Sequence, residues 1–103
     1  MLAHSVFFSL HDPSQASIDA LLEACKTYLT DHPGVVFFGV GTLNKELTRP
    51  VNDQGFDVAL HVVFDSKASH DAYQVAPRHL KFVEENKPKW KQVRVFDADL
   101  LPS

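Results

Sequence analysis

The chain has 103 residues, 45% of them hydrophobic and 22% charged, with a formal net charge of -3. This composition predicts one small globular domain, residues 1–103, and excludes a disordered or collagen-like chain. The slight acidic excess offers no basic stripe, so we expect no nucleic-acid partner. The single cysteine, Cys25, allows no disulfide within the chain, which favours a reducing, cytoplasmic location. The N-terminal apolar run ends at Asp12-Pro13, too early for a signal peptide or a membrane span.

The first half of the chain predicts a strand, a helix and a strand. Residues 2–10 alternate between two faces, and one face carries Leu2, His4, Val6, Phe8 and Leu10. Asp12-Pro13-Ser14 supplies the capping side chain and early proline that begin a helix. An apolar stripe then recurs at helical spacing, at Ile18, Leu21, Leu22, Cys25 and Leu29. Asp31-His32-Pro33-Gly34 ends this helix, and residues 35–42 form a continuously apolar strand.

The second half repeats this order. Residues 43–55 predict a polar loop that either rims a pocket or clasps a partner chain, and residues 56–64 predict a third strand. Asp65 or Ser66 can cap a second helix, which Pro77 interrupts because proline cannot donate the interior helical hydrogen bond. A further helical piece ends at residues 86–88, and a fourth strand covers about residues 91–99.

The element order is therefore β-α-β-β-α-β, which predicts an α+β, ferredoxin-like fold with a four-stranded antiparallel sheet and its helices on one face. The second face of the sheet is also apolar, since it carries Phe7, Ala59 and Val63. Apolar patches of that size are rarely left exposed. We therefore expect a homodimer formed through the open sheet face, with His61 at or near the interface.

Several residues form a constellation that resembles the stress-responsive A/B barrel (Dabb) family. They are the "His-x-Val-x-Phe" pattern beginning at His4, the "Tyr-x-x-x-Pro-x-His-x-x-Phe" pattern from Tyr73 to Phe82, Trp90, and Val95-Phe96-Asp97. The resemblance runs over nearly the whole chain. It implies a homodimer in which two sheets form a dimeric α+β barrel. Many members of this family have no assigned reaction.

One plant member of the family, olivetolic acid cyclase, closes a polyketide by aldol condensation without a cofactor. The resemblance implies catalytic roles for His79 and Tyr73, with Asp97 orienting His79 and His4 in register nearby. Two polar pocket residues of that cyclase are replaced here. Cys25 stands where the cyclase has a pocket tyrosine, and Val58 stands where it has a strand histidine. The resemblance thus implies no cofactor and does not carry over the substrate.

The residue types alone are compatible with either a catalytic or a structural role for each of these side chains. Histidine at neutral pH can act as a general base, but it is also a common buried hydrogen-bonding group. A tyrosine hydroxyl can stabilise an oxyanion, but most tyrosines pack in the core with the hydroxyl at the surface. His4, on an apolar face, is a second polar candidate for the same cavity. A small-molecule ligand would contact the mainly apolar residues Val6, Phe8, Cys25, Phe82 and Trp90.

The remaining histidines and the cysteine give weaker signals. His11, His32 and His70 lie in turns or polar helix positions and are expected at the surface. Metal-ligand spacings such as His-Glu-x-x-His are missing, so the sequence predicts no metal site. Cys25 lies in the helical stripe and is expected to be a buried, inert thiol.

Three functions follow from this reading. The first is a homodimeric A/B barrel protein without defined activity that binds a small apolar or carbonyl-bearing ligand. The second is a cofactor-independent, cyclase-like enzyme that uses His79 and Tyr73 for proton transfer. The third is a relative of the antibiotic-biosynthesis monooxygenases, which rests on fold analogy alone.

Overall fold

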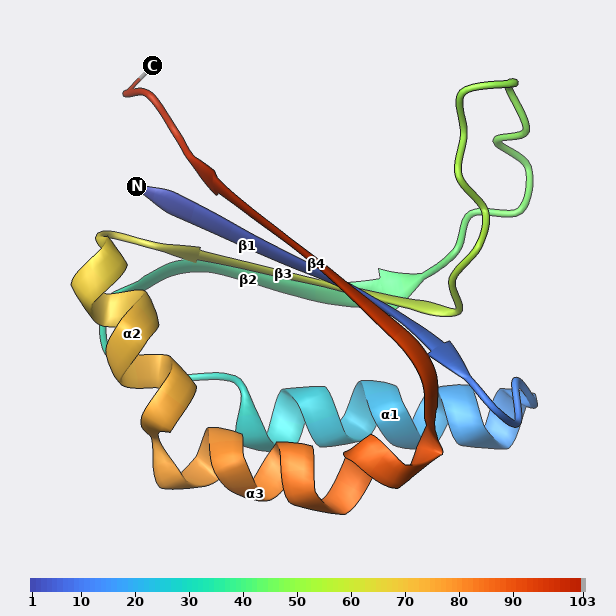
Figure 1. Ribbon diagram of the computed structural model, residues 1–103, viewed down its shortest axis with the longest axis horizontal. Helices are drawn as coiled ribbons and strands as arrows, with labels where there is room; N and C mark the ends of the chain where they lie inside the picture. The colour runs from blue at the N-terminus through green and yellow to red at the C-terminus, as the bar shows by residue number, and fades with distance from the viewer. Residues whose placement is uncertain (103) are drawn as a thin grey trace.

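The computed structural model describes residues 1–102, which form a four-stranded antiparallel sheet with all its helices on one side (Figure 1). The elements in chain order are β1 (Leu2–Leu10), α1 (Gln15–Tyr28), β2 (Val35–Thr42), β3 (Val58–Phe64), α2 (Lys67–Val75), α3 (Pro77–Asn86), the 3-10 helix η1 (Lys87–Lys89) and β4 (Trp90–Asp99). The predicted ferredoxin-like fold is confirmed. Residues 1–102 contain no helix with the length and apolar character that a bilayer span requires.

The sheet order is β2-β3-β1-β4, so β1 lies inside the sheet and pairs with both β3 and β4. Opposed residues of antiparallel strands point to the same face of the sheet. His4 therefore shares the helix-facing side with its two partners, Val62 on β3 and Asp97 on β4. This register places the side chains of His4, near the N-terminus, and Asp97, near the C-terminus, next to each other.

Side-chain caps begin two of the helices. The Ser14 hydroxyl accepts a hydrogen bond from the backbone N–H of Ser17, and the Ser66 hydroxyl accepts one from the N–H of Ser69. Pro77 stands at the start of α3, where its missing N–H costs little because the first helical N–H groups have no partner within the helix. The predicted interruption at Pro77 is thus the junction between α2 and α3.

The core lies between the helices and the inner strands. Every second residue of β1 and β3 is buried, as the alternation predicts. The corresponding side of β4 is less covered, because Val93 is 36% exposed and Val95 is 49% exposed although they pair with the buried Phe8 and Val6. The helices therefore leave a gap beneath β4.

Gly34 fixes the approach of α2 to the sheet. Its φ of 83° lies in the left-handed region, and a Cβ at this position would lie 2.1 Å from the Ser69 Oγ. Its carbonyl accepts a hydrogen bond from the N–H of Asp65, and the Asp65 carboxylate accepts one from Ser69. Only glycine fits this close contact, which holds the first turn of α2 beside the residue that precedes β2.

The open side of the sheet carries aromatic residues. The Phe7 ring lies 5.8 Å from that of Phe96 and 5.0 Å from that of Phe56, and Phe37 and Phe96 are more than half exposed. The 43–57 loop extends away from the helical layer on this side (Figure 1). Asp53, in that loop, accepts a hydrogen bond of 2.7 Å from the Arg94 guanidinium on β4. One face of the sheet is thus apolar and has no helix over it.

Candidate functional site

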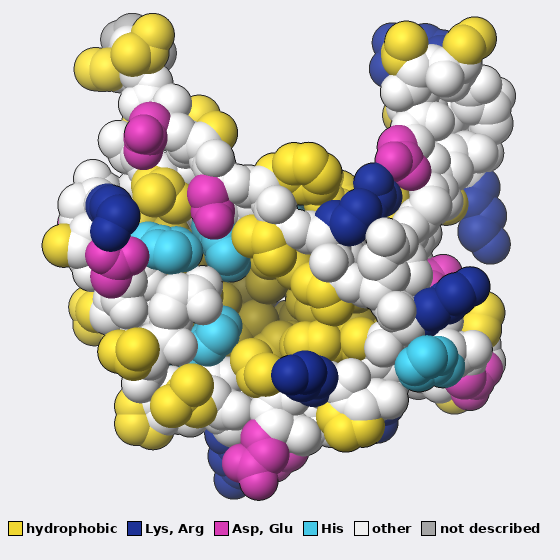
Figure 2. Space-filling model, in the orientation of Figure 1, with side chains coloured by type: hydrophobic (Ala, Val, Ile, Leu, Met, Phe, Trp, Pro, Cys, Tyr) yellow, Lys and Arg dark blue, Asp and Glu magenta, His cyan; other side chains and the backbone are white. Residues whose placement is uncertain are grey.

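A cleft of about 150 Å³ opens between β4 and the helices. Figure 2 shows this side of the molecule hollowed, with a hydrophobic floor and histidine side chains gathered along one flank. Strands β1 and β4 and helices α2 and α3 all contribute to its wall, together with Leu29 and Leu60. The cleft exists because the helices cover β1 and β3 but leave the edge strand β4 partly uncovered.

The structure places most of the predicted site residues on this cleft. Its polar lining includes His4, Tyr73 and His79, and its apolar lining includes Val6, Phe8, Phe82 and Trp90. Cys25 lies instead in the core, with no exposed surface, and does not line the cleft. Burial raises the pKa of its thiol to about 12, so it stays protonated at neutral pH.

His79 is positioned by the first turn of α3, two residues after Pro77. Its Nδ1 is buried and has no hydrogen-bond partner among residues 1–102. Burial lowers the pKa of this imidazole below its usual value. A backbone hydrogen bond with Gln74 opposes this shift, and the neighbouring His4, His32 and His70 add to it. A neutral imidazole with an unpaired buried nitrogen is suited to accept or donate one hydrogen bond to a bound molecule.

Tyr73 lies at the centre of the polar group. It is 2% exposed, and its ring centroid is 4.6 Å from that of His79, 4.9 Å from His32 and 6.1 Å from His4. Burial is the main cause that raises the pKa of its phenol. The hydroxyl therefore remains protonated and can donate a hydrogen bond to an oxygen in the cleft.

Asp97 does not orient His79, and that expectation is wrong. Its Oδ1 lies 2.5 Å from Nδ1 of His4, with which it is paired across β1 and β4. The strand register decides this partnership, because it places the two side chains directly opposite on the same face. His4 is therefore the imidazole whose orientation a carboxylate fixes.

Two histidines expected at the surface are not exposed. His32 is 8% exposed, and its Nε2 lies 2.8 Å from the Tyr28 carbonyl oxygen. The His70 side chain is 16% exposed, and its ring lies 5.1 Å from that of His4. Packing against Tyr73 buries His32, and packing against His4 and Phe64 partly buries His70. Neither sequence position carries a periodic signal of this. His61 is exposed on the open face, where the Ser5 Oγ and its Nδ1 lie 2.9 Å apart.

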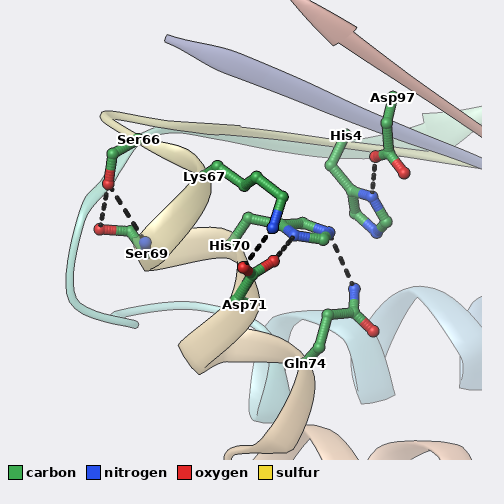
Figure 3. Close-up of polar contacts among 8 residues, drawn as sticks. All are labelled: His4, Ser66, Lys67, Ser69, His70, Asp71, Gln74 and Asp97. Atoms are coloured by element: carbon green, nitrogen blue, oxygen red, sulfur yellow. Dashed lines mark hydrogen bonds and ion pairs between the residues drawn. The ribbon is translucent and has the colours of Figure 1, made fainter.

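His4, which lines the cleft, forms a compact group with His70 and Asp97 (Figure 3). One nitrogen of each imidazole and one carboxylate oxygen all lie within 4.8 Å of one another. The sequence predicts no metal site, since these residues come from three separate elements and have no motif spacing. Among residues 1–102, these three side chains are the group whose ligand atoms lie close enough together to hold a metal ion.

Trp90 divides the cleft from a second cavity. Its ring packs 5.0 Å from Phe8 and 5.8 Å from Phe82, and its buried Nε1 has no partner among residues 1–102. The second cavity, about 270 Å³ in volume, lies beyond it and includes His11, Lys89 and Asn86 in its lining. Trp90 is the residue that both cavities share.

Comparison with known proteins agrees with this architecture. A crystal structure of a Dabb family protein with a ferredoxin-like fold from Mesorhizobium loti superimposes with a TM-score of 0.80 at 22% identity, covering 98% of this chain and 97% of the other. A dimeric ferredoxin-like protein of unknown function from Thermobifida fusca gives 0.80 at 16% identity, covering 96% and 90%. A hydroxynitrile lyase from Passiflora edulis gives 0.77 at 24% identity, covering 99% and 94%.

At these identities the structural likeness establishes the fold alone. No curated protein matches the chain in sequence. The family model of the stress responsive A/B barrel domain, however, matches residues 2–100, which is nearly the whole chain. On this match, and on the fold that agrees with it, the protein belongs to the stress responsive A/B barrel domain (Dabb) family.

Proposed function

We propose that this protein is a homodimer whose cleft binds a small, monocyclic or similarly compact molecule that carries a carbonyl or hydroxyl group. The observation that carries the proposal is the unpaired, buried Nδ1 of His79, beside the Tyr73 phenol in a mainly apolar wall. Buried polar atoms normally have partners, so an unpaired one on a cleft indicates a ligand group. An apolar cavity of about 150 Å³ accommodates a benzene-sized ligand, which sets the size expected here.

The open sheet face supports the dimer. It presents Phe7, Phe37 and Phe96 without a covering helix, and the 43–57 loop projects on the same side. A twofold pairing of this face would remove the patch from water. Structural neighbours described as dimeric include the Thermobifida protein. In such a dimer the loop has the reach to contact the partner chain.

Proton transfer to the bound molecule is the second candidate function. Burial favours the neutral form of His79, so its imidazole can accept a proton at neutral pH. The Tyr73 hydroxyl stays protonated and can donate a hydrogen bond. The ring centroids of the two residues are 4.6 Å apart. Together they can remove a proton next to, or on, an oxygen and stabilise the negative charge that develops. Aldol-type cyclisation and hydroxynitrile cleavage, the reaction named for the Passiflora neighbour, are both of this class.

Binding is tested first with aromatic ketones and phenols of one ring, by calorimetry and by two-dimensional NMR. We expect shifts confined to the cleft, and a loss of affinity of at least tenfold in His79→Ala and Tyr73→Phe. His61→Ala, on the open face, is the matched control and keeps wild-type affinity. Shifts elsewhere, or full binding by both cleft variants, would exclude the cleft as the binding site.

Catalysis is tested with mandelonitrile, whose cleavage releases benzaldehyde and cyanide and is followed by the ultraviolet absorbance of the aldehyde. A general base contributes roughly 10²- to 10⁴-fold, so His79→Ala is expected to lose at least that much of any turnover. Turnover that survives in His79→Ala would contradict the base assignment. Oxygen consumption with a quinol, measured on the same samples, would indicate the monooxygenase alternative instead.

A further inference from the structure

We propose that His4, His70 and Asp97 form a binding site for a divalent transition-metal ion, with Zn²⁺ as the expected occupant. One ligand atom from each residue lies within 4.8 Å of the other two. Ligand atoms around a tetrahedral Zn²⁺ are about 3.3 Å apart, given bond lengths near 2.0–2.2 Å. Small rotations of the three side chains therefore suffice for all of them to reach one ion.

The two imidazole rings already have the separation that such an ion requires. Two histidines bound to one tetrahedral Zn²⁺ have ring centroids about 5 Å apart, as follows from the Zn–N bond length. The centroids of His4 and His70 are 5.1 Å apart, and the rings are inclined at 60° rather than stacked. Figure 3 shows His70 directed from α2 toward the His4 ring on β1. The helix and the strand thus present the rings in a converging arrangement.

The surroundings of His70 favour the tautomer with its proton on Nδ1 and its lone pair on Nε2. Its Nδ1 lies 3.0 Å from the carboxylate Oδ1 of Asp71, and its Nε2 lies 3.4 Å from the amide Nε2 of Gln74 (Figure 3). A carboxylate at one ring nitrogen is the usual outer partner of a metal-binding histidine, because it fixes the tautomer and raises the basicity of the other nitrogen. A lone pair that accepts from Gln74 is also the one that a metal would use.

The donor set indicates the class of ion. Two imidazole nitrogens and one carboxylate oxygen suit Zn²⁺, Co²⁺ and similar first-row ions, whereas Ca²⁺ and Mg²⁺ prefer oxygen ligands. Three protein ligands leave a fourth position for water or for an added molecule. His4 is also a lining residue of the cleft, so an ion held here would lie at its end. This inference is independent of the proposed ligand, since the metal can be measured alone.

Asp97 is the side chain that must move most. Its Oδ1 lies 2.5 Å from Nδ1 of His4, closer than two ligands of one ion can be. The side chain is 44% exposed, so it can rotate without disturbing the core.

The test is a calorimetric titration of metal-free full-length protein with Zn²⁺, and a visible absorption spectrum with Co²⁺. We expect one ion per chain, ligand-field bands of an imidazole-bound Co²⁺, and a loss of Zn²⁺ affinity of at least tenfold in His70→Ala and in Asp97→Asn. Asp71→Asn, which weakens the outer partner, should lose about tenfold, the effect typical of such partners. Circular dichroism and the melting temperature of each variant establish that it is folded.

His61→Ala and His11→Ala are the matched controls, because both remove a histidine outside the cluster. The proposal is overturned if wild-type protein binds no Zn²⁺, or if His70→Ala and Asp97→Asn bind it as the wild type does. It is also overturned if either control lowers the affinity as much as the cluster variants do. None of these outcomes depends on His79, so a failure here is distinguishable from a failure of the proposed ligand-binding function.

Discussion

His4 and Asp97 lie directly opposite each other on β1 and β4, and a 2.5 Å hydrogen bond joins their side chains across 93 positions of sequence. His4 is 5% exposed, so its imidazole depends on this partner to satisfy a buried nitrogen. His4 also lines the cleft that contains Tyr73 and His79. One strand register thus connects the edge of the sheet to the candidate site.

Replacing Asp97 by alanine is expected to destabilise the fold by about 1 kcal/mol, because it leaves a buried imidazole nitrogen without its acceptor. The effect stays at that size because the Asp97 side chain is 44% exposed and solvent weakens the interaction. Urea denaturation followed by circular dichroism measures the change. Asp99→Ala, two residues further along β4, should alter stability by less than about 0.5 kcal/mol. Equal effects of the two variants would contradict the assigned role.

The lowered pKa of His79 predicts a pH-dependent stability. In the unfolded chain this histidine takes up a proton as the pH falls through its ordinary value of 6.5, whereas in the folded protein burial keeps it neutral to lower pH. The unfolded state then binds more protons, so the free energy of unfolding decreases as the pH falls below 6.5.

The variant His79→Gln removes this titration. Denaturation curves recorded at several pH values between the usual histidine and carboxylate ranges should fall less steeply for the variant than for the wild type. The other histidines and the carboxylates are present in both proteins, so the difference between the two curves isolates His79. Parallel curves would show that burial does not hold this imidazole neutral.

Cys25 is expected to resist thiol reagents in the native state. It has no exposed surface, so a reagent cannot reach its sulfur. Burial also raises the pKa of its thiol to about 12, so the reactive thiolate form is scarce at neutral pH. Labelling with Ellman's reagent should be slow in buffer and complete in denaturant, at one thiol per chain. Rapid native labelling would place Cys25 outside the core, and would revive a role for it in the cleft.

Phe96→Glu is expected to convert the proposed dimer into a monomer. Phe96 is 55% exposed on the open sheet face and lies 5.8 Å from the Phe7 ring, so a charge here would be buried in any pairing of this face. Light scattering should show half the wild-type mass. Leu80→Glu is the control, because Leu80 is similarly exposed on α3, on the helical side of the sheet. A monomeric wild type, or a dimer that survives Phe96→Glu, would exclude this interface.

Much of the fold could be predicted because its signals are local. The alternation along β1 assigns one side of the strand to the core, and Ser14 and Ser66 accept the cap hydrogen bonds that begin α1 and α2. Pro77 marks a helix junction because its ring is compatible only with the first turn of a helix. The third strand begins two residues later than predicted, although the Asp57 N–H still donates to the Phe8 carbonyl and the Asp57 carboxylate accepts from the Leu10 N–H. Each of these outcomes depends on neighbours that are close in sequence or directly paired.

The cleft could not be predicted in the same way, since it depends on which strand the helices leave uncovered. Sequence patterns assigned His79 and Tyr73 to one helical region, but they paired Asp97 with His79, whereas the strand register pairs it with His4. They also placed His32 and His70 at the surface, whereas His32 is buried beside Tyr73 and the His70 ring packs partly buried against Phe64.

By itself, therefore, the sequence determined the order of elements, the buried faces of β1 and β3 and the family of the chain, because periodicity, caps and motif spacing are properties of neighbouring residues. Tertiary structure alone decided that His4 pairs with Asp97 and lies beside His70. Those partnerships join β1, α2 and β4, and only the strand register and the packing angle of a helix bring such distant segments within hydrogen-bonding distance.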